Sequence, residues 1–284
     1  MRTAVCLINY NAFTDTIACV ESLRNEPCHI VVVDNGSTND SVAQMQQAWQ
    51  GEMNVWTTDD AHTFQQVARV ESPRVHLILS KKNGGFAYGN NVLLRFVKQQ
   101  IACTYVLWLN NDTEVPAGFI NTLEQTASQQ GTAQVALAAE ERNFYTGKRR
   151  HSGIHHLNLP TGLAFSFPLW PSHRYICGAC LFTSVDAPEW DESYFLYYED
   201  ADYAFRLQQN GYQMKATSAT HYLHKQGVST GQHRETVLRS MWHFYTLHYP
   251  RLRPWVRAIR AIQYLLSGNK TALSALNNSY ESAR

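Results

Sequence analysis

Residues 29–40 read HIVVVDNGSTND, an apolar, β-branched run that passes directly into a polar turn. A short run of this kind is typical of a strand that is buried on both faces of a parallel sheet. Similar apolar runs occupy residues 3–8, 75–79 and 104–109, and each leads into a loop rich in Asn, Asp or Gly. Patterns typical of helices lie between the runs. The sequence therefore predicts an α/β fold with a mostly parallel central sheet flanked by helices.

The polar loops after these strands should meet at one edge of the sheet, where parallel α/β sheets bind their ligands. Asp112 follows the fourth run and could bind Mg²⁺ or Mn²⁺, or it could cap a helix that starts near Pro116. Residues 34–37 could hydrogen-bond a nucleoside or simply form an Asx turn. Residues 83–91, NGGFAYGNN, carry enough glycine for the backbone to approach a ligand, before a helix whose N-terminus favours anions.

A second group of chemically competent side chains lies in the C-terminal half. Residues 199–202, EDAD, place three carboxylates directly after the aromatic run at 194–198. Clustered carboxylates shift one another's pKa, which suits a general base or a metal site, although acids also favour the N-terminus of a helix. His224 follows in a polar turn, where it could be either a metal ligand or a structural side chain.

Three regions give weaker patterns. Residues 51–74 are polar and we expect a surface insertion there, while residues 133–171 suggest a mobile loop region that meets a second substrate. Residues 175–182 predict a strand. Cys177 and Cys180 within it have CxxC spacing, but positions three apart in a strand point to opposite faces, so we expect two packed thiols.

The formal net charge of +1 gives no overall field that would attract nucleic acid. The sequence shows neither a signal-peptide pattern nor an apolar run of roughly 20 residues, so we expect a cytoplasmic protein with reduced thiols. Basic charge gathers in residues 234–270, which hold six Arg and one Lys but a single acid. The helix expected after Pro254 could lie on the anionic inner face of the plasma membrane, pack on the rest of the chain, or contact a second subunit in a homodimer.

Six motifs together resemble those of family 2 of the inverting glycosyltransferases, which have the GT-A fold, and in particular the rhamnosyltransferase-like subgroup of bacterial surface polysaccharide synthesis. The motifs are LINYN (7–11), VVDNGST (32–38), NGGFAYGNN (83–91), LWLNNDT (107–113), FLYYEDAD (195–202) and HKQGVS (224–229). The resemblance implies a catalytic domain over residues 1–232, with a nucleotide-binding half (1–115) and an acceptor-binding half (116–232). Residues 233–284 would form a C-terminal helical extension.

The resemblance also implies a role for each motif residue. The nucleoside would be held by Asn9, Tyr10, Asn11, Asp34 and Asn35. The diphosphate and donor sugar would lie against Asn83, Gly84, Gly85, Asn90, Asn110 and Asn111. The metal ligands would be Asp112, in the place of the family's DxD motif, and His224. The general base would be Asp200, supported by Glu199 and Asp202.

A protein with these residues is expected to transfer a sugar, with inversion, to a saccharide or lipid-linked oligosaccharide acceptor. The subgroup favours dTDP-rhamnose as donor, and a UDP-sugar is the alternative. Two other functions stay open: a nucleotidyltransferase, or an inactive module that binds a nucleotide sugar. The sequence departs from the family pattern at residues 188–191, PEWD in place of GGFD, and in the length of residues 51–74.

Overall fold

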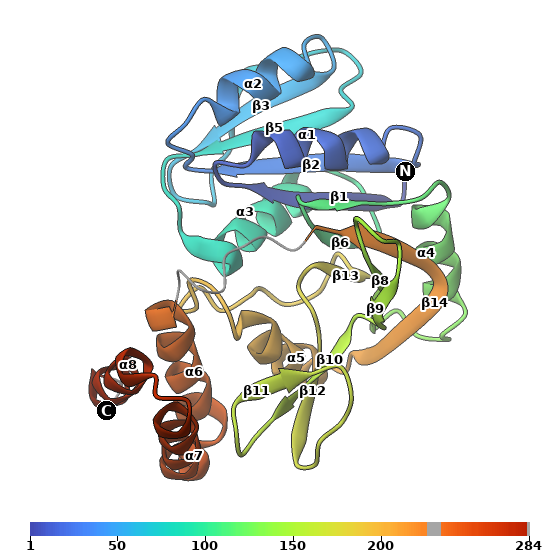
Figure 1. Ribbon diagram of the computed structural model, residues 1–284. Coiled ribbons are helices and arrows are strands. Elements are labelled where there is room, and N and C mark those ends of the chain that lie inside the picture. The colour runs from blue at the N-terminus through green and yellow to red at the C-terminus, as the bar shows by residue number, and fades with distance from the viewer. Residues whose placement is uncertain (226–233, 283–284) are drawn as a thin grey trace.

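The computed structural model describes residues 1–225 and 234–282, and its elements follow in chain order (Figure 1). The first part of the chain forms β1 (Thr3–Asn9), α1 (Phe13–Ser22), β2 (Cys28–Asn35), α2 (Ser41–Ala48), β3 (Met53–Thr58), β4 (Gln65–Ala68), β5 (Val75–Ser80), α3 (Gly85–Gln100), β6 (Tyr105–Asn110), β7 (Thr113–Glu114) and α4 (Phe119–Ser128). The rest forms β8 (Val135–Asn143), β9 (Arg149–His151), β10 (Ile154–Asn158), β11 (Leu163–Phe165), β12 (Ser172–Ile176), β13 (Cys180–Ser184), α5 (Glu199–Gln209), β14 (Gln213–His224), α6 (Arg234–His248), the 3₁₀ helix η1 (Pro250–Leu252), α7 (Arg253–Leu266) and α8 (Lys270–Ser282).

One large sheet organises the chain, with the strand order β4-β3-β5-β2-β1-β6-β13-β8-β14-β7. The neighbours from β3 to β6 are all parallel, which confirms the α/β fold and the four buried strands predicted from the sequence. Because successive strand residues point to opposite faces, Ala4 and Cys6 of β1 pack toward α3, while Val5 and Leu7 pack toward α1, α2 and α4. The parallel register sets Asn9 beside Asp34 at the carboxyl ends of β1 and β2.

The second half of the chain continues the sheet with β13, which is antiparallel to β6 and β8, and with β14, which is parallel to β8. A separate small sheet, in the order β11-β10-β12, lies beside α5 (Figure 1). Tyr175 of β12 and Ala201 of α5 belong to the same apolar cluster. The small sheet therefore forms a wall against the N-terminal part of α5.

The expectation of a surface insertion at residues 51–74 is wrong. This stretch contains β3 and β4, and β3 pairs in parallel with β5. Val55 is 3% exposed, but β4 at the sheet edge is largely exposed. A strand pair at an edge packs incompletely and tolerates polar residues, so it lacks the apolar run by which the central strands are recognised.

The expectation of a mobile loop region at residues 133–171 is also wrong, because β8 to β11 occupy it. The predicted strand at 175–182 is in fact two strands joined by a turn. Ile176 ends β12 in the small sheet, and Cys180 begins β13 in the large sheet. Cys180 belongs to an apolar cluster and Cys177 packs against it, so both thiols are packed, as predicted.

The C-terminal helices α6, α7 and α8 pack together beside α5 and the small sheet (Figure 1). The ring of His248 in α6 stacks on Phe205 of α5 with centroids 4.1 Å apart. In α7 only Val256 is buried, and the outward face exposes four large apolar side chains: Trp255 (67%), Ile262 (54%), Leu265 (64%) and Leu266 (84%). Within residues 1–225 and 234–282, every helix is too short or too polar to span a bilayer. The predicted boundary near 232 and motif residues 226–229 lie outside the described residues.

Candidate active site

A first cavity of about 350 Å³ opens at the carboxyl ends of β1 and β6. Its lining comes from the loops after these strands, the start of α3 and the segment before α5: Ile8, Tyr10, Ala12, Phe86, Asn90, Leu109, Asn110, Asn111 and Leu196. The amide nitrogen of Asn90 is buried and has no hydrogen-bond partner among the described residues. A buried amide without a partner is costly, so a ligand in this cavity would gain by accepting a hydrogen bond from it.

The candidate nucleoside residues are tied to one another beside this cavity. Asp34 accepts hydrogen bonds from the side-chain amide of Asn9 at 2.8 Å and from the hydroxyl of Ser37 at 2.6 Å. Asn11 accepts one from the backbone N–H of Thr38 at 2.8 Å. The backbone N–H of Ser37 also donates to Asp34, so residues 34–37 do form the Asx turn that was one alternative. The turn and a nucleoside role are compatible, because the turn holds Asp34 at the strand end.

The glycines at the start of α3 have a packing role that the sequence did not reveal. Gly85 has φ of +90°, and a side chain there would collide with the backbone carbonyl of Phe195. A side chain on Gly84 would collide with the ring of Tyr88. The side chain of Asn83 receives a hydrogen bond at 3.1 Å from Asn35, which fastens this loop to β2. Gly85 thus lets the segment before α5 dock on α3, and Phe86 and Asn90 are the motif residues that line the cavity.

Asp112 and His224 meet, as predicted, although they are more than a hundred residues apart in the sequence. His224 ends β14 and pairs with Thr113, which places its Nε2 3.2 Å from Oδ1 of Asp112. The alternative that Asp112 caps a helix is wrong, because α4 begins at Phe119 after Gly118 and has no side-chain cap. Burial opposes protonation of His224, but hydrogen bonds to Asp112 and Glu141 outweigh burial and raise its pKa to about 9.

Glu141 is a site residue that the sequence analysis missed. It is 1% exposed, and its Oε2 lies 3.1 Å from Nδ1 of His224, on the side away from Asp112. It also pairs with Arg150 and His151, and it accepts a hydrogen bond from the hydroxyl of Tyr222 at 2.9 Å. Residues 135–141 read VALAAEE, an apolar run ending in acids, and this strand pattern could have identified it.

A carboxylate and an imidazole suit a divalent transition metal, and Mn²⁺ accepts both donors more readily than Mg²⁺ does. Among the described residues, no group of three or more His, Cys, Asp and Glu side chains is arranged to hold a metal by itself. Asp112 and His224 therefore fit a cation whose remaining ligands come from a substrate, such as phosphate oxygens, and from water. Glu141 fits the familiar role of a carboxylate that orients a ligating histidine through its other ring nitrogen.

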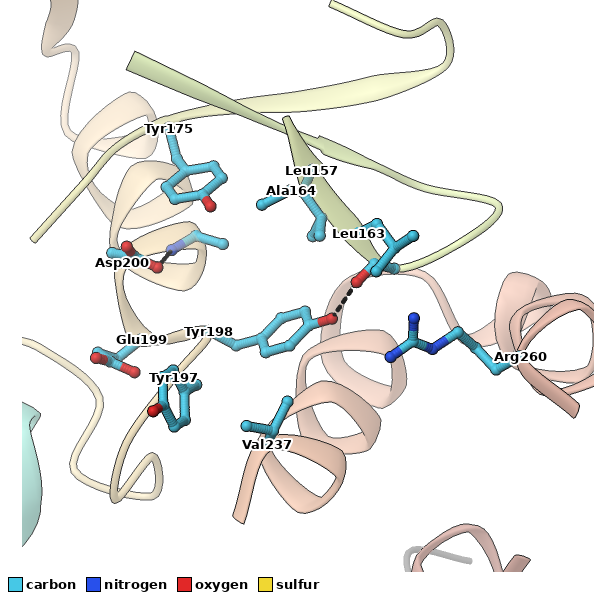
Figure 2. A pocket seen from close by; sticks show the side chains of 12 residues that line it. Leu157, Leu163, Ala164, Tyr175, Tyr197, Tyr198, Glu199, Asp200, Val237 and Arg260 are labelled. Carbon is cyan, nitrogen blue, oxygen red and sulfur yellow. Dashed lines mark hydrogen bonds between the residues drawn. The ribbon is translucent and has the colours of Figure 1, made fainter. Parts of the chain in front are cut away.

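A second cavity of about 260 Å³ lies between the start of α5, the small sheet and the C-terminal helices (Figure 2). Glu199 and Asp200 stand at one end of it, and Arg260 of α7 points in from the other. Tyr175 and Tyr198 form much of the wall between them. The cavity combines charged ends with an aromatic and aliphatic middle, which suits a sugar ring.

The two carboxyl groups at the start of α5 have raised pKa values. Burial raises the pKa of Asp200 to about 6, against hydrogen bonds from the backbone N–H groups of Gly178 at 3.4 Å and Ala201 at 2.8 Å. Burial, with the neighbouring charge of Asp200, raises the pKa of Glu199 well above its usual range. Burial thus raises the pKa of both neighbouring carboxyls, and carboxyls with raised pKa values are found where proton transfer is required.

Asp202 has a different place from the one expected. It lies in the first turn of α5, but it accepts hydrogen bonds from Nε of Arg206 at 2.8 Å and from His248 at 2.7 Å. The contact with His248 joins α5 to α6. Asp202 does not line the second cavity, so its support for Asp200 is limited to holding the helix in place.

A single segment borders both cavities. Leu196 lines the first, and residues 197–201 line the second. The turn before β13 links the same two places, because Asn110 donates its backbone N–H to the carbonyl of Ala179 at 2.9 Å, while Gly178 donates to Asp200. The turn that contains Gly178 and Ala179 therefore connects Asp200 to Asn110 at the end of β6.

Solved structures that resemble the chain include GalNAc-T7 and S. aureus TarS. GalNAc-T7, crystallised with UDP, GalNAc and Mn²⁺, is 9% identical with a TM-score of 0.67, and the match covers 100% of this chain and 56% of that one. TarS of S. aureus (residues 1–349) in complex with UDP-GlcNAc is 12% identical with a TM-score of 0.56, covering 100% and 80%. The same protein with UDP gives 14%, 0.52, 93% and 72%. At these identities the likeness establishes the fold, and it confirms the GT-A architecture.

A search of curated proteins finds no match. The family model described as glycosyl transferase family 2 matches residues 4–187, which is more than half of the chain. The matched range contains both strand ends that line the first cavity and stops before α5. The chain belongs to glycosyl transferase family 2.

Proposed function

We propose that the protein is an inverting glycosyltransferase that moves a sugar from a nucleotide diphosphate to a hydroxyl group of a saccharide acceptor. One observation carries the proposal: the segment 196–201 borders two cavities and carries Asp200, a partly buried carboxyl with its pKa raised to about 6. A transferase needs two adjoining substrate sites and a base between them. This segment borders both cavities and carries the proposed base.

The first cavity is the proposed donor site. It lies at the carboxyl ends of parallel strands, and the unpaired amide of Asn90 offers a hydrogen bond to the donor. Asp112 and His224 would hold Mn²⁺ or Mg²⁺ together with the diphosphate. A cation bound there would stabilise the negative charge that develops on the leaving diphosphate. The structurally similar TarS and GalNAc-T7 were crystallised with UDP or UDP-GlcNAc, which supports a nucleotide-sugar donor.

The second cavity is the proposed acceptor site. Asp200 takes the proton from the acceptor hydroxyl, and that oxygen attacks the anomeric carbon from the face opposite the diphosphate, so the configuration inverts. A base with a pKa close to the working pH is the most effective, and burial gives Asp200 such a value. Glu199 stays protonated beside it, so it adds no second negative charge to the site.

The finer assignments follow from the sequence resemblance. We propose dTDP-rhamnose or a UDP-sugar as donor, and assembly of a bacterial surface polysaccharide, such as O-antigen or capsule, as the role. Peripheral contact with the inner membrane face through the exposed apolar side of α7 would bring the enzyme to a lipid-linked acceptor.

The test is release of nucleotide diphosphate by the full chain with Mn²⁺, a mixed saccharide acceptor pool, and dTDP-rhamnose, UDP-glucose, UDP-galactose or UDP-GlcNAc in separate reactions. We expect one donor to be cleaved in a metal-dependent way. Tight binding of a donor with no release under any condition would favour an inactive binding module instead. Use of a nucleoside triphosphate, with release of pyrophosphate, would favour a nucleotidyltransferase.

A further inference from the structure

Arg260 is an arginine of the second cavity whose charge no described residue neutralises. Its guanidinium points into the cavity from α7, at the end opposite Glu199 and Asp200 (Figure 2). Its contacts are all neutral: Gln263 Oε1 at 3.4 Å, the hydroxyl of Tyr264 at 3.1 Å, and the ring of Tyr264 at 5.3 Å. Its buried Nε has no hydrogen-bond partner among the described residues.

Some partly buried arginines have acidic partners, whereas Arg257, which lies outside the cavity, contacts neutral groups as Arg260 does. Arg206 pairs with Asp191 and Asp202, and Arg95 pairs with Glu189 and Glu192. A guanidinium placed in a partly desolvated cavity without an acid loses solvation that nothing in the chain restores. Arginine is also the residue best suited to bind a planar or tetrahedral oxyanion through paired N–H groups.

We propose that Arg260 binds an anionic group, a phosphate or a carboxylate, carried by the acceptor sugar. The inference rests on the proposed function in that it takes the second cavity as the acceptor site. The acceptor then lies with its reactive hydroxyl at Asp200 and its anion at Arg260, while the tyrosine walls contact the ring faces. Opposite charges at the two ends permit only one orientation, and the C-terminal extension becomes part of the acceptor site.

Binding of three sugars to the full chain tests this without turnover. The probes are glucose 1-phosphate, glucuronate and neutral glucose, each titrated by calorimetry in the presence of Mn²⁺ and excess UDP, which keeps phosphate probes out of the donor cavity. The proteins are the wild type, Arg260→Gln, Arg260→Lys and the control Arg257→Gln. Arg257 lies one turn earlier on α7, contacts Asn277 and the ring of Tyr280, and does not line the cavity.

We expect the wild type and Arg257→Gln to bind one anionic sugar about tenfold or more tightly than glucose, because hydrogen bonds to charged groups are stronger than those between neutral groups. Arg260→Gln should lose that preference. Arg260→Lys should keep part of it, since lysine offers charge without the planar fork. Preference for glucose 1-phosphate identifies a sugar phosphate, and preference for glucuronate identifies a uronic acid. Equal binding of all three sugars, or equal behaviour of the two Gln variants, would overturn the inference.

The outcome is independent of the transferase assignment. An active enzyme whose Arg260→Gln variant binds every probe as the wild type does would keep the proposed function and lose this inference. Anion binding at Arg260 in a chain that cleaves no nucleotide sugar would keep the site and lose the transferase.

Discussion

The two cavities of this molecule are built in different ways. The first lies at the ends of parallel strands β1 and β6, and its polar lining is made of neutral amides and a tyrosine hydroxyl. The second is assembled from α5, the small sheet and the C-terminal helices, and it carries charge at both ends. The contrast fits the two tasks proposed for the cavities: neutral hydrogen-bonding groups would hold a substrate that brings its own negative charge, and a partly buried carboxyl would accept a proton.

The largest effect should come from removing the metal ligand beside the first cavity. In Asp112→Asn, nucleotide release should fall by about 10³-fold, because a cation contributes several kcal/mol of charge stabilisation. Excess EDTA on the wild type should have a similar effect. Full activity of Asp112→Asn in EDTA would show that the donor site works without a metal and would weaken the division of tasks between the cavities.

Glu141 should act on the metal through His224. In Glu141→Gln, the affinity for Mn²⁺ in the presence of UDP should fall by about 10–100-fold, as is usual when the partner of a ligating histidine is changed. The matched control is Glu140→Gln, because Glu140 pairs with Arg142 and Arg149 instead. Calorimetric Mn²⁺ titration and thermal unfolding, measured on both variants, would separate loss of the metal from loss of the fold. Equal affinities in the two variants would contradict the role given to Glu141.

The pH dependence should report the second cavity. Burial holds the pKa of Asp200 at about 6, so the base is ionised above that pH and becomes protonated below it. At saturating donor and Mn²⁺, kcat should be level from pH 7 to 8 and fall by about tenfold for each unit below pH 6. A profile that is flat down to pH 5 would argue against a carboxylate base of this pKa.

The smallest effect should come from the exposed face of α7. Replacing Leu265 and Leu266 with Gln removes apolar surface without touching either cavity. We expect the variant to sediment less with vesicles containing anionic lipid than the wild type does, and to keep its activity on a soluble acceptor. Equal sedimentation of the two proteins would remove the membrane contact from the account.

The sequence was most informative where local pattern and tertiary role agree. The strands β1, β2, β5 and β6 are apolar runs because both faces are buried, and their polar ends meet because the strands are parallel. The Asp112–His224 contact followed from motif order, and the structure places it at 3.2 Å. The acids at the start of α5 were recognised as a cluster, but their different surroundings were not, because Asp202 contacts His248 of α6, which is distant in the sequence.

Other features depend on contacts between distant segments, and no local pattern reveals them. The strand pattern of residues 135–141 could have marked Glu141 as an acid at the end of a buried strand, but it could not show the contact of Glu141 with His224. The need for glycine at position 85 arises from the carbonyl of Phe195, more than a hundred residues away. Arg260 belonged to what looked like a basic stripe of a surface helix, and only the packing of α7 beside the small sheet turns it into a cavity residue.

The most direct measurement compares two neighbouring carboxyls, Asp200→Asn and Glu199→Gln, for nucleotide release and for UDP binding. Because burial raises the pKa of Glu199 well above its usual range and so favours the neutral carboxyl, a neutral amide imitates it and its variant should keep most of the activity. Asp200→Asn should lose about 10²–10⁴-fold in kcat, and both variants should bind UDP as the wild type does. Two results would contradict the assignment of Asp200 as the base between two separate sites. One is an inactive Glu199→Gln beside an active Asp200→Asn, and the other is loss of UDP binding together with activity.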